Sequence, residues 1–79
     1  MNINFDKARE LFQKYPELPN LLKSGYLRKY QIQDALMLTK AETDALVDEL
    51  IIAGVFKQTP FGYKMLVRVQ KELELENLM

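Results

Sequence analysis

The stretch LTKAETDALVDELIIAG, residues 38–54, predicts a capped amphipathic helix that ends at a glycine. Thr39 followed three positions later by Glu42 is a capping box: the hydroxyl accepts an amide proton of the first turn, and the carboxylate accepts the Thr39 N–H. Gly54 supplies a left-handed stop. The side chains that recur at helical spacing, and so predict the buried stripe, are Thr43, Leu46, Val47 and Leu50.

Upstream of this stretch the sequence predicts two short helices in the N-terminal part. Residues 5–15 (FDKARELFQKY) place apolar side chains at helical spacing, with Asn4 as the cap and Pro16 as the end. Residues 19–24 (PNLLKS) open on a proline, which suits a first helical turn, and Gly25 stops them.

A third helix is predicted directly before the opening stretch. Residues 26–27 form a short extended link, residues 29–36 (KYQIQDAL) form the helix, and a tight break follows at residues 37–38. The side chains expected to face inward are Ile32, Ala35 and Leu36. Two helices around so short a turn are typical of a helix-turn-helix.

Downstream, two stretches rich in aromatic and β-branched residues predict a β-hairpin. They are VFKQT (residues 55–59) and YKMLVRV (residues 63–69). The turn TPFG between them has Pro60 at its second position and Gly62 where a positive φ is needed. Residues 70–79 suit a helix, although their Leu-Glu alternation also suits a strand; we favour the helix.

Length and composition limit the function classes. Seventy-nine residues predict a single domain, and a formal net charge of zero means that any nucleic-acid binding must come from local clusters of basic residues. The absence of Cys and His removes thiolate chemistry, the usual transition-metal ligands and the commonest general base. We therefore expect no enzyme, no metal site, no cofactor and no small-molecule substrate. Without a signal-peptide pattern or a long apolar run, we expect a cytoplasmic protein that does not enter a membrane.

Residues 26–67 resemble the winged helix-turn-helix superfamily, and most closely its MarR-like pattern. In that pattern a Leu-x-Leu pair, a small cap and a basic residue open the second helix, here Leu36, Leu38, Thr39 and Lys40. A Leu-Val-Asp-x-Leu run and a glycine then precede the first wing strand, here Leu46, Val47, Asp48, Leu50, Gly54, Val55 and Phe56.

The resemblance implies a mostly α fold with a small β-hairpin wing, a single winged-helix domain over residues 1–79. Its parts would be the N-terminal helices (1–25), the helix-turn-helix (28–54), the wing hairpin (55–69) and the C-terminal helix (70–79). It also implies a small DNA-binding protein, a transcriptional or accessory regulator of bacterial or phage type. Its partner would be double-stranded DNA, and a homodimer would double the number of phosphate contacts. The residues expected at the DNA are Arg28, Lys29, Thr39, Lys40, Lys57 and Lys64, with Thr39 also capping its helix.

The sequence departs from the family at the positions that would face the major groove. DNA-binding members commonly place Ser, Thr, Arg or Gln there, whereas this chain has Ala41, Glu42, Asp44, Ala45 and Asp48. Acids near phosphates are repelled, so a second hypothesis is a winged-helix module that docks a protein and binds no DNA. Its docking surface would consist of Asp44, Asp48, Glu49, Ile51 and Ile52.

Several apolar side chains have two interpretations in the sequence. Ile51 and Ile52 are either covered by the first or last helix or exposed as an interface. Phe61 either enters a minor groove or a partner cavity, or folds back over the hairpin. We expect rim positions of the core, not base-stacking platforms, for Tyr26, Tyr30 and Tyr63. The terminal residues that either dimerise or pack on the N-terminal helices are Leu73, Leu75, Leu78 and Met79.

Overall fold

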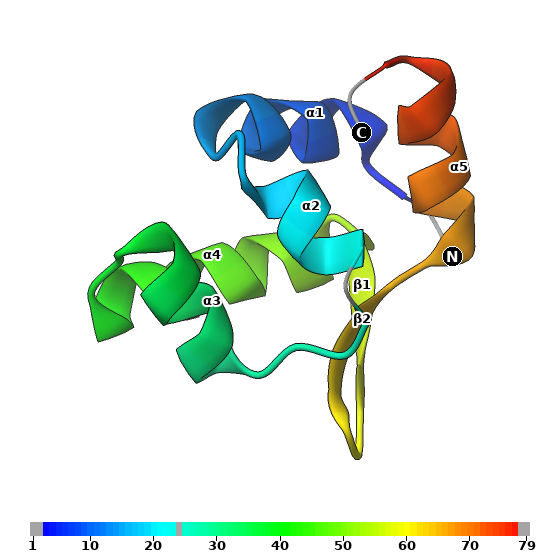
Figure 1. The fold of residues 1–79 in the computed structure, drawn as a ribbon. Helices are drawn as coiled ribbons and strands as arrows, with labels where there is room; N and C mark the ends of the chain where they lie inside the picture. Colours follow the sequence, from blue (N-terminus) through cyan, green and yellow to red (C-terminus); the bar gives the residue numbers. More distant parts are fainter. Residues whose placement is uncertain (1–2, 24, 78–79) are drawn as a thin grey trace.

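The computed structural model describes residues 3–23 and 25–77 of the chain. Over these residues the fold is mostly helical with a two-stranded antiparallel hairpin. The elements are α1 (Phe5–Lys14), α2 (Leu18–Lys23), α3 (Lys29–Leu36), α4 (Lys40–Ile52), β1 (Phe56–Thr59), β2 (Gly62–Met65) and α5 (Val67–Leu75). Figure 1 shows α2 between α1 and the α3–α4 pair, with the hairpin extending away from α1.

The local signals at the helix ends act as predicted. The Asn4 side chain accepts the Lys7 N–H at 3.0 Å and caps α1. At α4, Glu42 N–H donates to the Thr39 hydroxyl at 3.1 Å, and Thr39 N–H donates to the Glu42 carboxylate at 2.9 Å. Gly54 has φ 77°. Val55 N–H then donates a hydrogen bond to the Leu50 carbonyl, which closes the end of the helix.

The core draws on every helix and on both strands. Thr43, Leu46, Val47 and Leu50 are buried, which confirms the predicted stripe of α4. The remaining core side chains are Ala8, Leu11, Phe12, Leu18, Leu22, Leu27, Ile32, Ala53, Val55, Phe56, Tyr63, Met65, Val69 and Leu73. No helix in the described part of the chain is long and apolar enough to cross a membrane.

The tight turn between α3 and α4 rests on an unusual backbone conformation. Met37 has φ 55° and ψ 45°, the left-handed region that favours glycine, and its side chain is 91% exposed. The prediction that Ala35 faces inward is wrong: Ala35 is exposed, whereas Ile32 is buried. Ala35 lines an open cavity of about 330 Å³ between the end of α3 and the corner that joins α1 to α2.

The hairpin is shorter than predicted, because α5 begins at Val67. Leu66 donates its N–H to Val55 at 3.0 Å in an extended conformation, and the chain then turns into the helix. The interpretation of residues 67–69 as strand, and of the last helix as starting at residue 70, is wrong. Val69 and Leu73, four positions apart, lie on the same side of the helix and are both fully buried. The predicted helical residues 78–79, like residue 24 in the second helix, lie outside the described residues.

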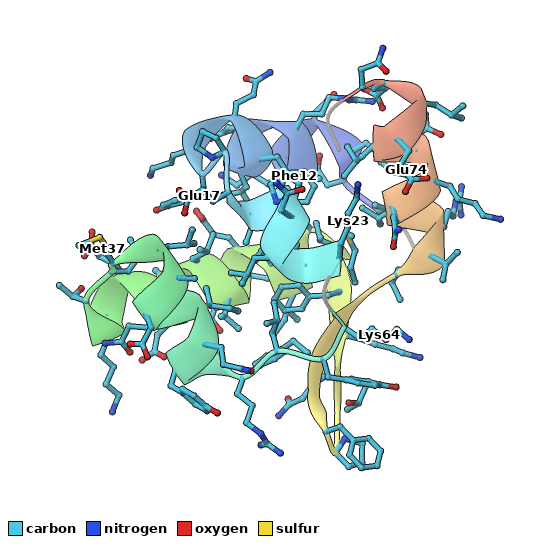
Figure 2. All side chains as sticks on the ribbon, in the orientation of Figure 1. Phe12, Glu17, Lys23, Met37, Lys64 and Glu74 are labelled. Carbon is cyan, nitrogen blue, oxygen red and sulfur yellow. The ribbon has the colours of Figure 1, made fainter. Side chains whose placement is uncertain are left out.

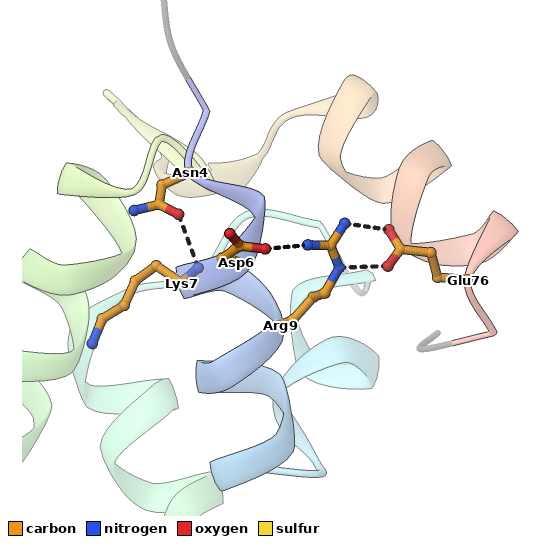
Figure 3. Close-up of polar contacts among 5 residues, drawn as sticks. All are labelled: Asn4, Asp6, Lys7, Arg9 and Glu76. Carbon is orange, nitrogen blue, oxygen red and sulfur yellow. Dashed lines mark hydrogen bonds and ion pairs between the residues drawn. The ribbon is translucent and has the colours of Figure 1, made fainter.

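An ion pair holds α5 on α1 (Figure 3). The Arg9 guanidinium donates from Nε and Nη2 to the two carboxylate oxygens of Glu76, the second at 3.0 Å, and from Nη1 to Asp6 at 2.7 Å. The hydrogen bonds from Arg9 lower the pKa of the Glu76 carboxyl and raise that of the Arg9 guanidinium. The bidentate pair links α1 to the C-terminal end of α5, two segments that are remote in sequence.

Candidate nucleic-acid interface

The outward face of α4 carries no basic side chain. At 100° per residue, the positions opposite the buried stripe are Ala41, Ala45, Asp48 and Ile52, and all four are exposed. Two of these side chains are too small to reach far beyond the helix, one is acidic and one is apolar. This face therefore offers no hydrogen-bond donor from a side chain to a base edge.

The acids of α4 are largely engaged within the chain. Glu42 is part of the capping box, and the hydrogen bonds from Thr39 lower the pKa of its carboxyl. Asp44 accepts a hydrogen bond from Lys29 Nζ at 3.1 Å, and Glu49 forms an ion pair with Lys7 at 3.5 Å. Of the four acids, only Asp48 has no hydrogen bond or ion pair within the described ranges.

Lys29 belongs to this intramolecular network. The hydrogen bond to Asp44 raises the pKa of the Lys29 ammonium, and burial, although it acts in the opposite direction, has a smaller effect. The pair connects the first turn of α3 to the second turn of α4. Asp44 therefore offsets much of the positive charge of Lys29, a residue that the sequence predicts to contact DNA.

The remaining predicted basic residues form two groups. Arg28 and Lys40 are exposed at the starts of α3 and α4. Lys57 and Lys64 are exposed on the hairpin, where they are register partners on adjacent strands. In Figure 2 the Lys64 side chain lies on the side of the hairpin that faces away from α3 and α4. Thr39 is occupied by its capping hydrogen bond.

Two aromatic rings accompany the hairpin lysines. Tyr26 lies next to the backbone pair of Leu27 and Tyr63, which brings it to the Lys64 side of the sheet. Lys64 Nζ is 5.0 Å from the Tyr26 ring centroid, and the Phe61 and Tyr26 centroids are 5.7 Å apart. We call the surface made by Tyr26, Lys57, Phe61 and Lys64 the hairpin outer face.

The sequence did not predict this association. Tyr63 belongs to the buried core, whereas Tyr26 is 47% exposed and Tyr30 is also exposed, so the prediction of core-rim positions is wrong for Tyr26 and Tyr30. Nothing in the spacing brings Tyr26 to Phe61, because the two rings are 35 positions apart and meet only after the link pairs with the hairpin.

The hairpin outer face includes a hollow of about 250 Å³. Its lining residues are Tyr26, Lys57, Thr59, Lys64, Met65, Leu66 and Val67. Its lining combines two lysines with aromatic, hydroxyl and apolar residues. Within residues 3–23 and 25–77 no ion pair links a carboxylate to Lys57 or Lys64.

The two isoleucines at the end of α4, Ile51 and Ile52, are not covered by the first or last helix. Ile51 is 41% exposed and Ile52 is 83% exposed, so the interpretation in which a helix covers them is wrong. Their exposure leaves an apolar surface at the C-terminal end of α4.

Two further findings bear on the kind of site. No group of three or more potential metal ligands occurs in the part of the chain that the structure describes. Comparison of the chain with protein families, with curated proteins and with solved structures finds no match.

Proposed function

We propose that this chain is a winged helix-turn-helix protein that binds double-stranded DNA mainly through its phosphates. In this proposal α3 and α4 are the helix-turn-helix, the hairpin is the wing, and Leu27 pairs with Tyr63 at the edge of the wing. The order of the elements and the spacing of residues 26–67 support this assignment.

The observation that carries the proposal is the pairing of Lys57 with Lys64. Like charges directly opposite each other on adjacent strands destabilise a sheet, and no carboxylate of the described residues forms an ion pair with either lysine. A phosphate placed between the two ammonium groups would remove this repulsion. Arg28 and Lys40 supply further positive charge at the starts of the two helices.

The outward face of α4 supports binding with little sequence selectivity. Ala41 and Ala45 permit close approach to a groove, but they carry no donor, and Asp48 repels phosphates. We therefore expect affinity to come from counterion release and to fall steeply as salt increases. A homodimer would double the number of phosphate contacts.

Fluorescence anisotropy with a labelled duplex of arbitrary sequence, between about 50 and 200 mM salt, tests the proposal. We expect the chain to bind, with a logarithm of the binding constant that falls linearly with the logarithm of the salt concentration. In the double variant Lys57→Ala/Lys64→Ala the magnitude of this slope should decrease by about 2, one unit for each lost phosphate contact. The matched control is Lys14→Ala/Lys71→Ala, which removes two exposed lysines from α1 and α5 and should leave the slope unchanged. Absence of binding at the lowest salt would overturn the proposal.

A second candidate function is the docking of a protein on α4. The exposure of Ile52, beside Asp48 and Ile51, is the observation that favours it. In this case Asp44→Lys/Asp48→Lys should abolish capture of the partner, and Lys40→Ala/Lys57→Ala should have no effect on it. The opposite pattern, with loss of duplex binding only in the lysine variant, would reject docking in favour of DNA.

A further inference from the structure

The tip of the hairpin presents an aromatic ring to solvent on an ordered turn. Phe61 is 68% exposed. Its N–H donates to the Thr59 hydroxyl at 3.1 Å, and that hydroxyl donates to the Gly62 carbonyl at 2.8 Å. These bonds hold the backbone of the turn, so the ring is displayed at a defined position. The exposed ring offers an apolar surface that another molecule can cover, with a gain in free energy.

The surroundings of the ring are positive and aromatic. Tyr26 lies 5.7 Å from Phe61 between ring centroids, with the planes tilted by 58°. Lys64 Nζ lies 5.0 Å from the Tyr26 centroid, and Lys57 is its partner across the sheet. Aromatic rings beside unpaired cations are what proteins use to bind single-stranded nucleic acid, because bases stack on the rings while phosphates meet the cations.

The hollow beside these residues has a size that suits one small group. Its volume is about 250 Å³, below the range of about 300 to 1,000 Å³ typical of sites for drug-sized ligands. A single planar nucleic-acid base is smaller than a drug-sized ligand and so is a group of suitable size. Tyr26, the ring partner of Phe61, and the two lysines line this hollow, so a base stacked on Phe61 would have its phosphates close to the lysines.

We propose that the hairpin outer face binds unpaired nucleotides, with a base stacked on Phe61 and its neighbouring phosphates beside Lys57 and Lys64. The inference rests on the proposed function and narrows it to DNA that combines a duplex with unpaired bases, such as a duplex with a single-stranded extension. In an intact duplex the faces of the bases are stacked on each other, and opening them costs a few kcal/mol. Stacking on Phe61 accepts any base, which agrees with the lack of donors on α4.

The test compares a labelled blunt duplex with a duplex of the same paired length that carries a single-stranded extension. We expect the full chain to bind the extended DNA more tightly. Phe61→Ala should weaken binding of the extended DNA by roughly 5- to 100-fold and leave the blunt duplex unaffected. Leu75→Ala is the matched control, because Leu75 is also an exposed apolar residue but lies on α5, away from the hairpin.

A second variant gives a readout independent of affinity. The chain has no tryptophan, so Phe61→Trp introduces a single one at the tip. We expect this variant to keep the preference for the extended DNA and its fluorescence to be quenched by the extension, because tryptophan also stacks on bases.

The outcomes separate this inference from the function on which it rests. If the chain binds both DNAs equally and Phe61→Ala changes neither affinity, unpaired bases are not recognised, and duplex binding still stands. If Phe61→Ala weakens both DNAs equally, Phe61 contacts paired DNA and the inference is wrong. Binding to neither DNA overturns both proposals, and capture of an acidic protein on the same lysines would then be the alternative use of this face.

Discussion

Leu27 and Tyr63 exchange both of their backbone hydrogen bonds: Leu27 N–H donates to Tyr63 O at 2.9 Å, and Tyr63 N–H donates to Leu27 O at 2.6 Å. The link between α2 and α3 thus pairs with the free edge of β2. This pair fixes the start of α3 relative to the hairpin and places Tyr26 on the hairpin outer face.

The first prediction concerns Gly62, whose position is constrained by this pairing. A Cβ at Gly62 would lie 2.6 Å from the Leu27 carbonyl oxygen, and its φ of +127° strains any other residue. We expect Gly62→Ala to lower the free energy of unfolding by more than about 1 kcal/mol. Urea denaturation followed by circular dichroism measures it. Gly25→Ala is the control, because φ there is +114° but no atom lies within 4 Å of the added Cβ; equal losses in the two variants would show that the Leu27 contact does not matter.

The second prediction concerns the cap of α4. Thr39→Ala removes the hydroxyl that accepts the Glu42 N–H, and we expect a loss of about 1 kcal/mol in the free energy of unfolding, within a range of roughly 0.5–2 kcal/mol. Thermal and urea denaturation measure it. Thr39→Ser keeps the hydroxyl and should retain most of the stability. A serine variant as unstable as the alanine variant would contradict the capping role.

The third prediction concerns stability in acid. The pKa of Glu76 is lowered in the folded state by the hydrogen bonds from Arg9, so the folded protein binds this proton less readily than the unfolded chain. The stabilisation is therefore complete above the ordinary pKa of 4.5 and is lost as the pH falls through the lower folded-state value. In a plot of the free energy of unfolding against pH, Glu76→Gln should make the decrease at acid pH less steep. Glu17→Gln, which changes an exposed carboxylate outside this ion pair, should leave that decrease unchanged.

The fourth prediction distinguishes the two candidate functions at Asp48. Asp48→Asn removes the one acid of α4 that has no hydrogen bond or ion pair within the described residues, and we expect it to raise the affinity for duplex DNA. One like-charge approach at about 4 Å costs on the order of 4 kcal/mol before screening, so the gain should be clear at low salt and smaller at high salt. Anisotropy titrations measure it, with Glu17→Gln as the charge-matched control. Unchanged DNA affinity together with weaker capture of a protein would favour docking.

The fifth prediction concerns Met37 in the turn between α3 and α4. Its left-handed backbone is unfavourable for any side chain, and the side chain itself is exposed. Met37→Gly should raise the free energy of unfolding by up to about 1 kcal/mol. The substitution relieves the backbone strain, but glycine also increases the entropy of the unfolded chain, which offsets part of the gain. Met37→Ala keeps the strain and should bring no gain. A destabilised glycine variant would show that the methionine side chain contributes to packing in the 330 Å³ cavity.

The sequence alone determined the features that depend on a few neighbouring residues. The Asn4 cap, the Thr39–Glu42 capping box and the Gly54 stop each act within one helical turn, so adjacent residue types suffice to predict them. The buried stripe of α4 follows from helical spacing, and the hairpin turn from Pro60 and Gly62. That the basic residues bind DNA stays a prediction, and their arrangement could not be predicted from the sequence.

Only the tertiary structure decided which distant groups meet. It joined Leu27 to Tyr63, Lys29 to Asp44 and Arg9 to Glu76, pairs separated by 36, 15 and 67 positions. It left Ile52 exposed and ended β2 early, because burial of Val69 with Leu73 depends on where the last helix packs. Local hydrogen bonding and side-chain periodicity carry no information about such contacts. The hairpin outer face, the surface on which both proposals depend, exists because the chain folds Tyr26 against Phe61 and Lys64.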